Sequence, residues 1–403
     1  MKESIRMSAK TVKKSSLIIF IALYLTYTAI YVARLNLSMA SPEMKAAGML
    51  SSTQLGLLGS LFSVIYACGR LFNGILSDRV APWKMICTGL LLAGIANLAI
   101  GMLPPFAGMA LCWSANAFAQ SMLWSSILTV VSMTYDPETA RKRMSVMVTS
   151  VATGNILGIL VNTFLIDRFG LRWAFIIPGA VTLILAVVDL ILIRTFPASA
   201  DSASKRHINI FSLLANREIR TATVPAFLHG IMKDNVTLWM AVFFVDRYAI
   251  DLEASAWFVL FIPIVGFLGR SLYSLFYRLC REQEHKVSMY GFVACVVFAG
   301  VICVPAVPPV IAMVALSVIY AATSVINTSF LSIYPIRFVE TGNVASVSGV
   351  MDFVTYLGAG VASACYGLVI EAAGYMPMFV SWAVVSVLGV MCVLRLVKVQ
   401  NNA

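Results

Sequence analysis

Long runs of apolar residues, separated by short polar or proline-containing segments, dominate the chain. A helix that crosses the roughly 30 Å hydrocarbon core of a bilayer needs about 20 predominantly apolar residues. Twelve runs reach that length, and we predict that each forms one membrane-spanning helix. The predicted spans are residues 16–39, 53–76, 84–103, 106–134, 145–166, 173–194, 222–245, 255–277, 287–305, 309–334, 344–370 and 376–397.

One long polar stretch, residues 195–221, interrupts this pattern halfway along the chain. Its Ser, Ala, Asp and Lys content is typical of a solvated linker, and a short amphipathic helix is expected at Ile208–Leu214. We therefore predict an N-terminal six-helix bundle over residues 1–194, a cytoplasmic linker over 195–221 and a C-terminal six-helix bundle over 222–403.

Composition supports a membrane protein. The chain is 60% hydrophobic and 12% charged, with a mean hydropathy of +0.89, whereas a soluble domain has roughly 45–50% apolar and about 25% charged residues. Because a water-soluble surface needs polar cover, these values exclude a soluble enzyme, a disordered chain and a nucleic-acid-binding module. No nucleophile–base pair, metal-ligand spacing or nucleotide-binding glycine loop stands out, so we expect neither enzymatic activity nor a metal or cofactor.

The distribution of basic residues predicts the topology. Most of the 29 lysine and arginine residues lie at the termini and in alternate connections, whereas the opposite connections contain only Lys45, Arg168, Arg172 and Arg247. Cytoplasmic segments collect Lys and Arg, so we expect both termini in the cytoplasm. The same asymmetry accounts for the net charge of +11 without a nucleic-acid partner.

The two halves of the chain repeat each other at a nearly constant offset. Gly69-Arg70 recurs as Gly269-Arg270 in similar surroundings. Further matching positions are Arg34 and Lys233, Asn36 and Asn235, Asp167 and Glu371, and Gly170 and Gly374. Six spans, a linker and six similar spans form the parallel repeat of one large class of secondary transporter, in which the substrate site lies between the halves.

Several motifs resemble those of a known family. Residues 74–79, Gly-Ile-Leu-Ser-Asp-Arg, resemble the signature loop of the major facilitator superfamily. Finer motifs resemble the organophosphate:phosphate antiporters, the glycerol phosphate and hexose phosphate carriers. They are Tyr31-Val-Ala-Arg34-Leu-Asn36, Tyr66-Ala-Cys-Gly-Arg70-Leu-Phe-Asn73-Gly74, Gln120-Ser-Met-Leu-Trp124, and Ser348-Gly349 followed by Tyr356-Leu-Gly-Ala-Gly360. The resemblance implies an all-α integral membrane fold of twelve helices in two pseudo-symmetric six-helix bundles.

The resemblance also implies roles for individual residues. In that family a first-span arginine and a seventh-span cation hold the substrate phosphate, and these correspond here to Arg34 and Lys233. A further second-span cation corresponds to Arg70. The signature loop influences the conformational switch in the family, which assigns Asp78 and Arg79 to gating.

Charged residues inside the predicted spans are functional candidates on physical grounds too, because an ionisable group at bilayer depth costs several kcal/mol unless it is paired or faces water. Arg34 follows Tyr27 and Tyr31 on one helical face, and the alternative is an arginine that extends to the nearby interface. Lys233 lies deep in its span with His229 one turn earlier, and the alternative is a lysine neutralised by an acid.

Two acidic residues are candidates for charge coupling. We interpret Asp352 first as a counter-ion of Lys233 in the empty site, with a proton-carrying carboxylate or a structural pair as alternatives. Asp234 directly follows Lys233 and is therefore expected to point elsewhere. The remaining predicted substrate-binding residues are Tyr31, Asn36, Tyr66, Trp124, His229 and Tyr356.

Together these features predict a monomeric secondary transporter in a bacterial cytoplasmic membrane, which carries a small organic anion, phosphorylated by resemblance, in exchange for inorganic phosphate. The resemblance leaves the substrate open, because Val151 stands where glycerol phosphate carriers have a histidine, and the seventh-span cation is often arginine. One alternative is a proton-coupled symporter of a carboxylate. Another is a transporter-like sensor that binds a sugar phosphate.

Overall fold

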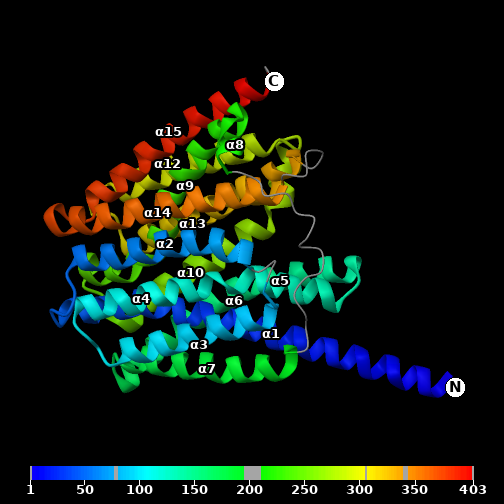
Figure 1. Cartoon of the computed structure of the whole chain (residues 1–403). Helices are drawn as coiled ribbons and strands as arrows, with labels where there is room; N and C mark the ends of the chain where they lie inside the picture. Colours follow the sequence, from blue (N-terminus) through cyan, green and yellow to red (C-terminus); the bar gives the residue numbers. More distant parts are fainter. Residues whose placement is uncertain (1, 77–79, 195–209, 305, 339–343, 402–403) are drawn as a thin grey trace. The chain divides into compact units, whose positions relative to one another are not determined.

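The computed structural model describes residues 2–76, 80–194, 210–304, 306–338 and 344–401. Within these residues the chain is built from helices alone (Figure 1). In chain order they are α1 (Lys2–Ala46), α2 (Ser52–Leu76), α3 (Pro82–Gly101), α4 (Phe106–Ser121), α5 (Leu123–Thr134), α6 (Pro137–Phe169), α7 (Trp173–Ile193), α8 (Ile210–Ala215), α9 (Arg217–Tyr248), α10 (Leu252–Ser271), α11 (Tyr273–Leu279), α12 (Glu284–Ile302), α13 (Pro309–Thr328), the π-helix η2 (Ser329–Ile333), the 3₁₀-helix η3 (Tyr334–Phe338), α14 (Val344–Ala373) and α15 (Met376–Asn401).

The predicted membrane spans are confirmed as helices. Eleven helical segments of the described chain are long and apolar enough to cross a bilayer, and α4 with α5 forms one of them over Phe106–Thr134. The remaining predicted span lies in α9, which is 32 residues long but less apolar. Its lower hydropathy has a local cause, since His229, Lys233 and Asp234 lie near its middle.

Local sequence signals set the helix ends. Asp136 accepts a hydrogen bond from the Thr139 amide at the start of α6, and Asn216 accepts from the amides of Glu218 and Ile219 at the start of α9. Such side-chain acceptors satisfy amides that have no partner inside the helix. The predicted short helix is confirmed as α8 for residues 210–214, while residues 208 and 209 lie outside the described part of the chain.

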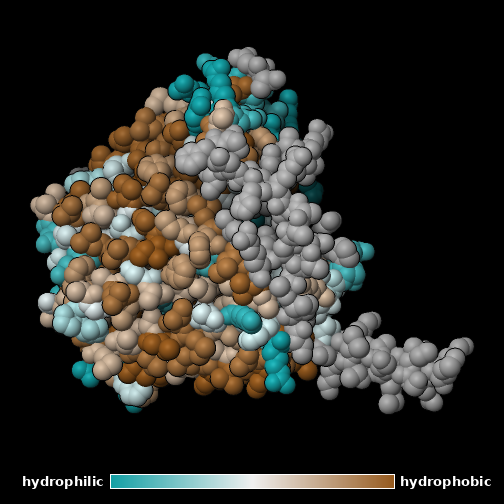
Figure 2. Space-filling model, viewed as in Figure 1, coloured by the Kyte–Doolittle hydropathy of each residue, from teal (hydrophilic) through white to brown (hydrophobic). Residues whose placement is uncertain are grey.

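The described helices present a largely apolar surface (Figure 2). Large hydrophobic side chains are exposed on several of them, including Leu111 at 73%, Phe164 at 60% and Ile191 at 67%. Exposed apolar side chains in such numbers favour burial in another apolar phase, which for long helices is lipid. The chain is thus a multi-span membrane protein.

Contacts between residues divide the chain into two compact units. The first contains Met1–Asn36 and Gly69–Lys205, and the second contains Leu37–Cys68 and Arg206–Ala403. Helices α1 and α2 are therefore each divided between the units. The predicted bundle boundaries follow the sequence repeat rather than this division by contact, and they stay a prediction.

Equivalent helix contacts recur within the two units. A Cβ atom at Gly69 would collide with the Ser121 side chain, and one at Gly269 would lie 2.9 Å from the Ala321 Cβ. Both pairs of positions match in the repeat. The helix ends match as well, because α6 ends before Gly170 (φ 91°) and α14 ends before Gly374 (φ 73°). Glycine adopts these left-handed conformations without the steric cost of a Cβ atom.

Candidate functional site

A cluster of aromatic rings lies beside Arg34 in the first unit. The Arg34 guanidinium carbon lies 5.6 Å from the centre of the Tyr31 ring. The Tyr27 ring is 5.4 Å from Tyr31 and 5.0 Å from Trp124 of α5, centre to centre. Tyr31, Arg34 and Trp124 are half-buried, whereas Tyr27 is buried. A guanidinium over an aromatic face is attracted by the ring, which helps to hold it in place. The predicted contact of Arg34 with substrate stays a prediction.

Asn36, two residues further along α1, has a different environment. Its side chain is fully buried, and its Nδ2 donates to Asn97 Oδ1 of α3 at 2.6 Å. The Asn97 amide in turn lies 3.3 Å from Asn116 Oδ1, which also accepts from Gln120 Nε2 at 3.0 Å. This chain of amides ties α1, α3 and α4 together. Its members are polar residues inside apolar runs, but their mutual contacts could not be read from sequence.

Arg70 lies on the part of α2 that belongs to the first unit and is half-buried. Two neighbours fix this stretch of α2 against α4. Gly69 allows close approach to Ser121, and Asn73 Nδ2 donates to Ser121 Oγ at 2.7 Å. The sequence motifs around Arg70 and Gln120 thus belong to helices that pack on each other. The predicted contact between Arg70 and substrate stays a prediction.

Lys233 lies midway along α9, in the second unit. Its ammonium nitrogen is 4.7 Å from the centre of the Tyr356 ring and 2.9 Å from Asp234 Oδ1. The Tyr356 ring of α14 also packs on Tyr66 of α2, with 4.9 Å between ring centres. Four predicted site residues, Lys233, Asp234, Tyr66 and Tyr356, therefore lie together.

The expected orientation of Asp234 is wrong. Neighbouring helix positions diverge by about 100°, but the four-carbon lysine stem is long and flexible enough to turn its ammonium toward the next residue. Lys233 consequently forms an ion pair with Asp234, with 18% and 25% of the two side chains exposed. The role of Asp352 as a counter-ion stays a prediction.

Two further polar residues of α9 are Asn235, which contacts α14, and His229, which lies in the protein interior. Asn235 Oδ1 accepts from Ser363 Oγ at 2.8 Å, and its Nδ2 lies 3.3 Å from the Ala359 carbonyl oxygen. His229 is completely buried, and its Nδ1 donates to the Ala226 carbonyl at 3.0 Å. Its predicted contact with substrate would require a rearrangement of this buried ring.

The predicted gating residues Asp78 and Arg79 lie outside the described residues.

Asp189, an acidic residue in an otherwise aliphatic helix, is fully buried and accepts a hydrogen bond from Thr26 Oγ1 at 2.7 Å. No group of His, Cys, Asp or Glu side chains among the described residues is arranged to hold a metal ion.

Intramembrane cations on a fold of repeated helices define a multi-span membrane transporter. The sequence profile of the Major Facilitator Superfamily matches residues 19–363. The chain belongs to this superfamily, and its fold is the major facilitator fold. A solved structure, the nucleoside transporter NupG, has a TM-score of 0.76 at 14% identity, covering 94% of this chain and 98% of that one.

Relatives in the sequence comparison confirm the resemblance to organophosphate carriers. The probable hexose phosphate transport protein of Chlamydia trachomatis is 25% identical over 258 residues, which cover 60% of this chain and 56% of that protein. The membrane sensor protein UhpC of Salmonella typhimurium is 34% identical over 102 residues, or 25% of this chain and 23% of that protein. The matched region thus spans about half of the first relative's length and a quarter of the second's.

Proposed function

We propose that the protein is a secondary transporter that carries a small phosphorylated organic anion by alternating access. The observation that carries the proposal is the pair Arg34 and Lys233. They occupy matching positions of the two repeats, and each lies over a tyrosine ring. The names of the relatives support a phosphorylated substrate. We place the binding contacts on Arg34 and Lys233 with Arg70, and the gating role on Asp78 and Arg79.

Charge balance suggests exchange as the mode of transport. The proposed contacts are three cations, Arg34, Arg70 and Lys233, and one carboxylate, Asp234, which pairs with Lys233. We infer that such a site is positively charged as a whole, and closing it in a poorly solvated environment without an anion is costly. A phosphate dianion neutralises the cations, with the arginine fork holding two oxygens and the lysine acting as a point charge. The empty carrier then reorients slowly, so one phosphate-bearing anion is exchanged for another.

The cellular setting completes the proposal. We place the protein in the bacterial inner membrane as a monomer, with both termini in the cytoplasm, because basic residues concentrate in the corresponding segments. Residues 1–194 and 222–403 form the two moving bundles, and 195–221 joins them. The protein carries out no covalent chemistry on its substrate.

Counterflow in proteoliposomes tests the proposal. Vesicles preloaded with inorganic phosphate should take up labelled phosphate, and external organophosphates should compete. Vesicles with the Arg34→Ala/Lys233→Ala protein, matched for protein content and folding, provide the control. Lack of exchange with every phosphate compound tried would overturn the proposal. Uptake of a carboxylate that requires a proton gradient, but no internal phosphate, would instead establish the symport alternative.

The similarity to a membrane sensor protein favours one second candidate. A sensor would bind the same phosphorylated molecule through Arg34 and Lys233 but would signal to a membrane partner rather than transport its ligand. Binding of an organophosphate in detergent without any counterflow in vesicles would distinguish sensing from transport.

A further inference from the structure

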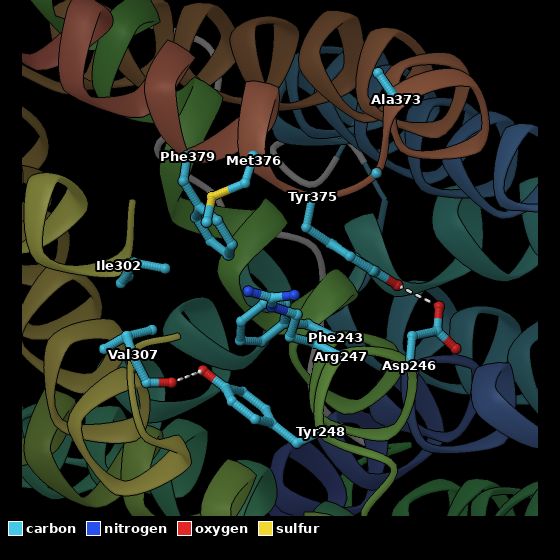
Figure 3. A pocket seen from close by; sticks show the side chains of 11 residues that line it. Phe243, Asp246, Arg247, Tyr248, Ile302, Val307, Ala373, Tyr375, Met376 and Phe379 are labelled. Atoms are coloured by element: carbon cyan, nitrogen blue, oxygen red, sulfur yellow. Dashed lines mark hydrogen bonds between the residues drawn. The ribbon is translucent and has the colours of Figure 1, made fainter. Parts of the chain in front are cut away.

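A pocket of about 270 Å³ lies at the end of the second unit that is predicted to face outward (Figure 3). It is framed by the last turn of α9, the end of α12 and the turn that joins α14 to α15. Aromatic side chains form much of its wall, namely Phe243, Tyr248, Tyr375 and Phe379. The pocket is slightly smaller than sites for drug-sized ligands, which occupy about 300–1,000 Å³, so it suits a compact molecule or a headgroup.

Internal contacts neutralise one of the two charged residues in this pocket. Asp246 forms an ion pair with Lys45 at the outer end of α1 and accepts a hydrogen bond from the Tyr375 hydroxyl at 2.7 Å. Tyr375 is half-buried, and desolvation together with the adjacent Asp246 carboxylate raises the pKa of its hydroxyl, so it remains a donor at physiological pH. Asp246 is therefore compensated by both partners.

Arg247 is the second charged residue of the pocket. Its side chain is exposed, and within the described part of the chain it forms neither an ion pair nor a hydrogen bond. With Asp246 occupied by Lys45 and Tyr375, the Arg247 guanidinium leaves the pocket with a net positive charge. Figure 3 shows this guanidinium among the pocket's aromatic side chains.

We propose that this pocket is a second anion-binding site, which takes a phosphate group joined to a short organic moiety. The Arg247 fork matches phosphate oxygens, and the aromatic wall covers the organic part. Tyr248 and Tyr375 lie at helix ends, where tyrosines mark the membrane–water interface. The phosphate sources at that depth are lipid headgroups and phosphorylated solutes, and both offer the same chemistry to Arg247.

The site is independent of the proposed transport function, because none of its lining residues is a predicted contact of the central site. The experiment therefore uses the Arg34→Ala/Lys233→Ala protein as its background. Binding of labelled inorganic phosphate and of glycerol phosphate is measured in detergent, with and without Arg247→Gln. Arg168→Gln is the matched control, since Arg168 is an exposed arginine in the last turn of α6, at another helix end that is predicted to face outward.

We expect Arg247→Gln to weaken phosphate binding about tenfold or more, as loss of a charged hydrogen-bonding partner does, and Arg168→Gln to leave it unchanged. A second arm compares retention of phosphatidylglycerol and of an uncharged diacylglycerol by native mass spectrometry. Lipid loss on Arg247→Gln identifies a headgroup as the source, whereas loss of soluble phosphate alone identifies a solute. Equal behaviour of the Arg247 and Arg168 variants in both arms would overturn the proposal.

Discussion

The ammonium of Lys233 lies 2.9 Å from the carboxylate of Asp234, its neighbour in sequence. The same ammonium lies over the Tyr356 ring. In the proposed site, an internal carboxylate therefore competes with the substrate anion for this lysine. Such a pair lowers the cost of a cation in the empty site, and it must be weakened when an anion binds.

Asp234→Asn removes this internal competitor. We expect phosphate to bind up to about fivefold more tightly, since partly exposed ion pairs contribute about 1 kcal/mol or less. Release of phosphate should slow in parallel and reduce the rate of exchange. Equilibrium binding in detergent and exchange in vesicles measure the two effects. Weaker phosphate binding by a normally folded Asp234→Asn protein would show that Asp234 supports the site instead.

Arg34 and Lys233 provide a second prediction. Hydrogen bonds to charged groups are worth about 1.5–3 kcal/mol, so Arg34→Ala or Lys233→Ala should weaken phosphate binding roughly ten- to a hundredfold. Arg34→Lys should also be harmful, because an ammonium lacks the planar fork. Lys233→Arg should be tolerated better. If Asp352 compensates Lys233, Asp352→Asn should restore part of the thermal stability lost in Lys233→Ala.

The measurement for these variants is substrate binding in detergent, with thermal unfolding as the control for folding. Substrate binding by Arg34→Ala and Lys233→Ala that equals that of the parent protein would place the site elsewhere and contradict the proposed mechanism.

Sequence predicts the spans well, because the thickness of a bilayer demands long apolar runs that are visible locally. It also predicts that Arg34, Tyr31 and Tyr27 share a face, since helical spacing fixes that arrangement. It does not predict the packing of the Tyr27 ring against Trp124 or the ion pair of Lys233 with Asp234. The first depends on packing between distant helices, and the second depends on the flexibility of one side chain.

The break between α10 and α11 and the change from α13 into η2 were also invisible in the sequence pattern. Both interrupt predicted spans without a proline or glycine at the junction. The residue that follows α10 is Leu272, and the residue that follows α13 is Ser329. Hydropathy reports only that a segment is apolar, and it does not distinguish α-helical from π-helical hydrogen bonding.

Gly230 lies one turn before Lys233, where α9 closely approaches α14. A substitution there tests this contact. A Cβ atom at Gly230 would collide with the backbone carbonyl of Thr355, which cannot rotate away as a side chain can. We expect Gly230→Ala to destabilise the protein by about 1–3 kcal/mol, as overpacking does, and to weaken phosphate binding at Lys233. Gly300→Ala in α12 is the control, because open space surrounds that position. Equal unfolding temperatures for the two variants would refute this tight contact.

A substitution of Asn36 distinguishes a structural role, in the hydrogen bond to Asn97, from a contact with substrate. Asn36→Ala leaves the buried Asn97 oxygen without its 2.6 Å donor, and an unsatisfied buried acceptor costs about 1–3 kcal/mol. We therefore expect a lower unfolding temperature, measured by thermal denaturation in detergent, and a phosphate affinity that changes less than in Arg34→Ala. A stable Asn36→Ala protein that has lost phosphate binding would instead support direct contact with substrate.

Asp136 gives a prediction about pH at the start of α6. The hydrogen bond from the Thr139 amide, 3.1 Å from Asp136 Oδ1, is the main cause of a lowered pKa for this carboxylate. A group whose pKa is lower in the folded state stabilises that state above its unfolded pKa of about 3.9. The stabilisation disappears as the pH falls through the folded value. Asp136→Asn keeps a capping acceptor but has no charge, so its unfolding temperature should lie below that of the parent protein at pH 7, and the difference should shrink as the pH falls below about 4. The converse change at the cap of α9, Asn216→Asp, should raise the unfolding temperature at pH 7 and lose that gain in acid. A gap between Asp136→Asn and the parent that stays constant from pH 7 to pH 3 would show that the charge of Asp136 does not stabilise this helix.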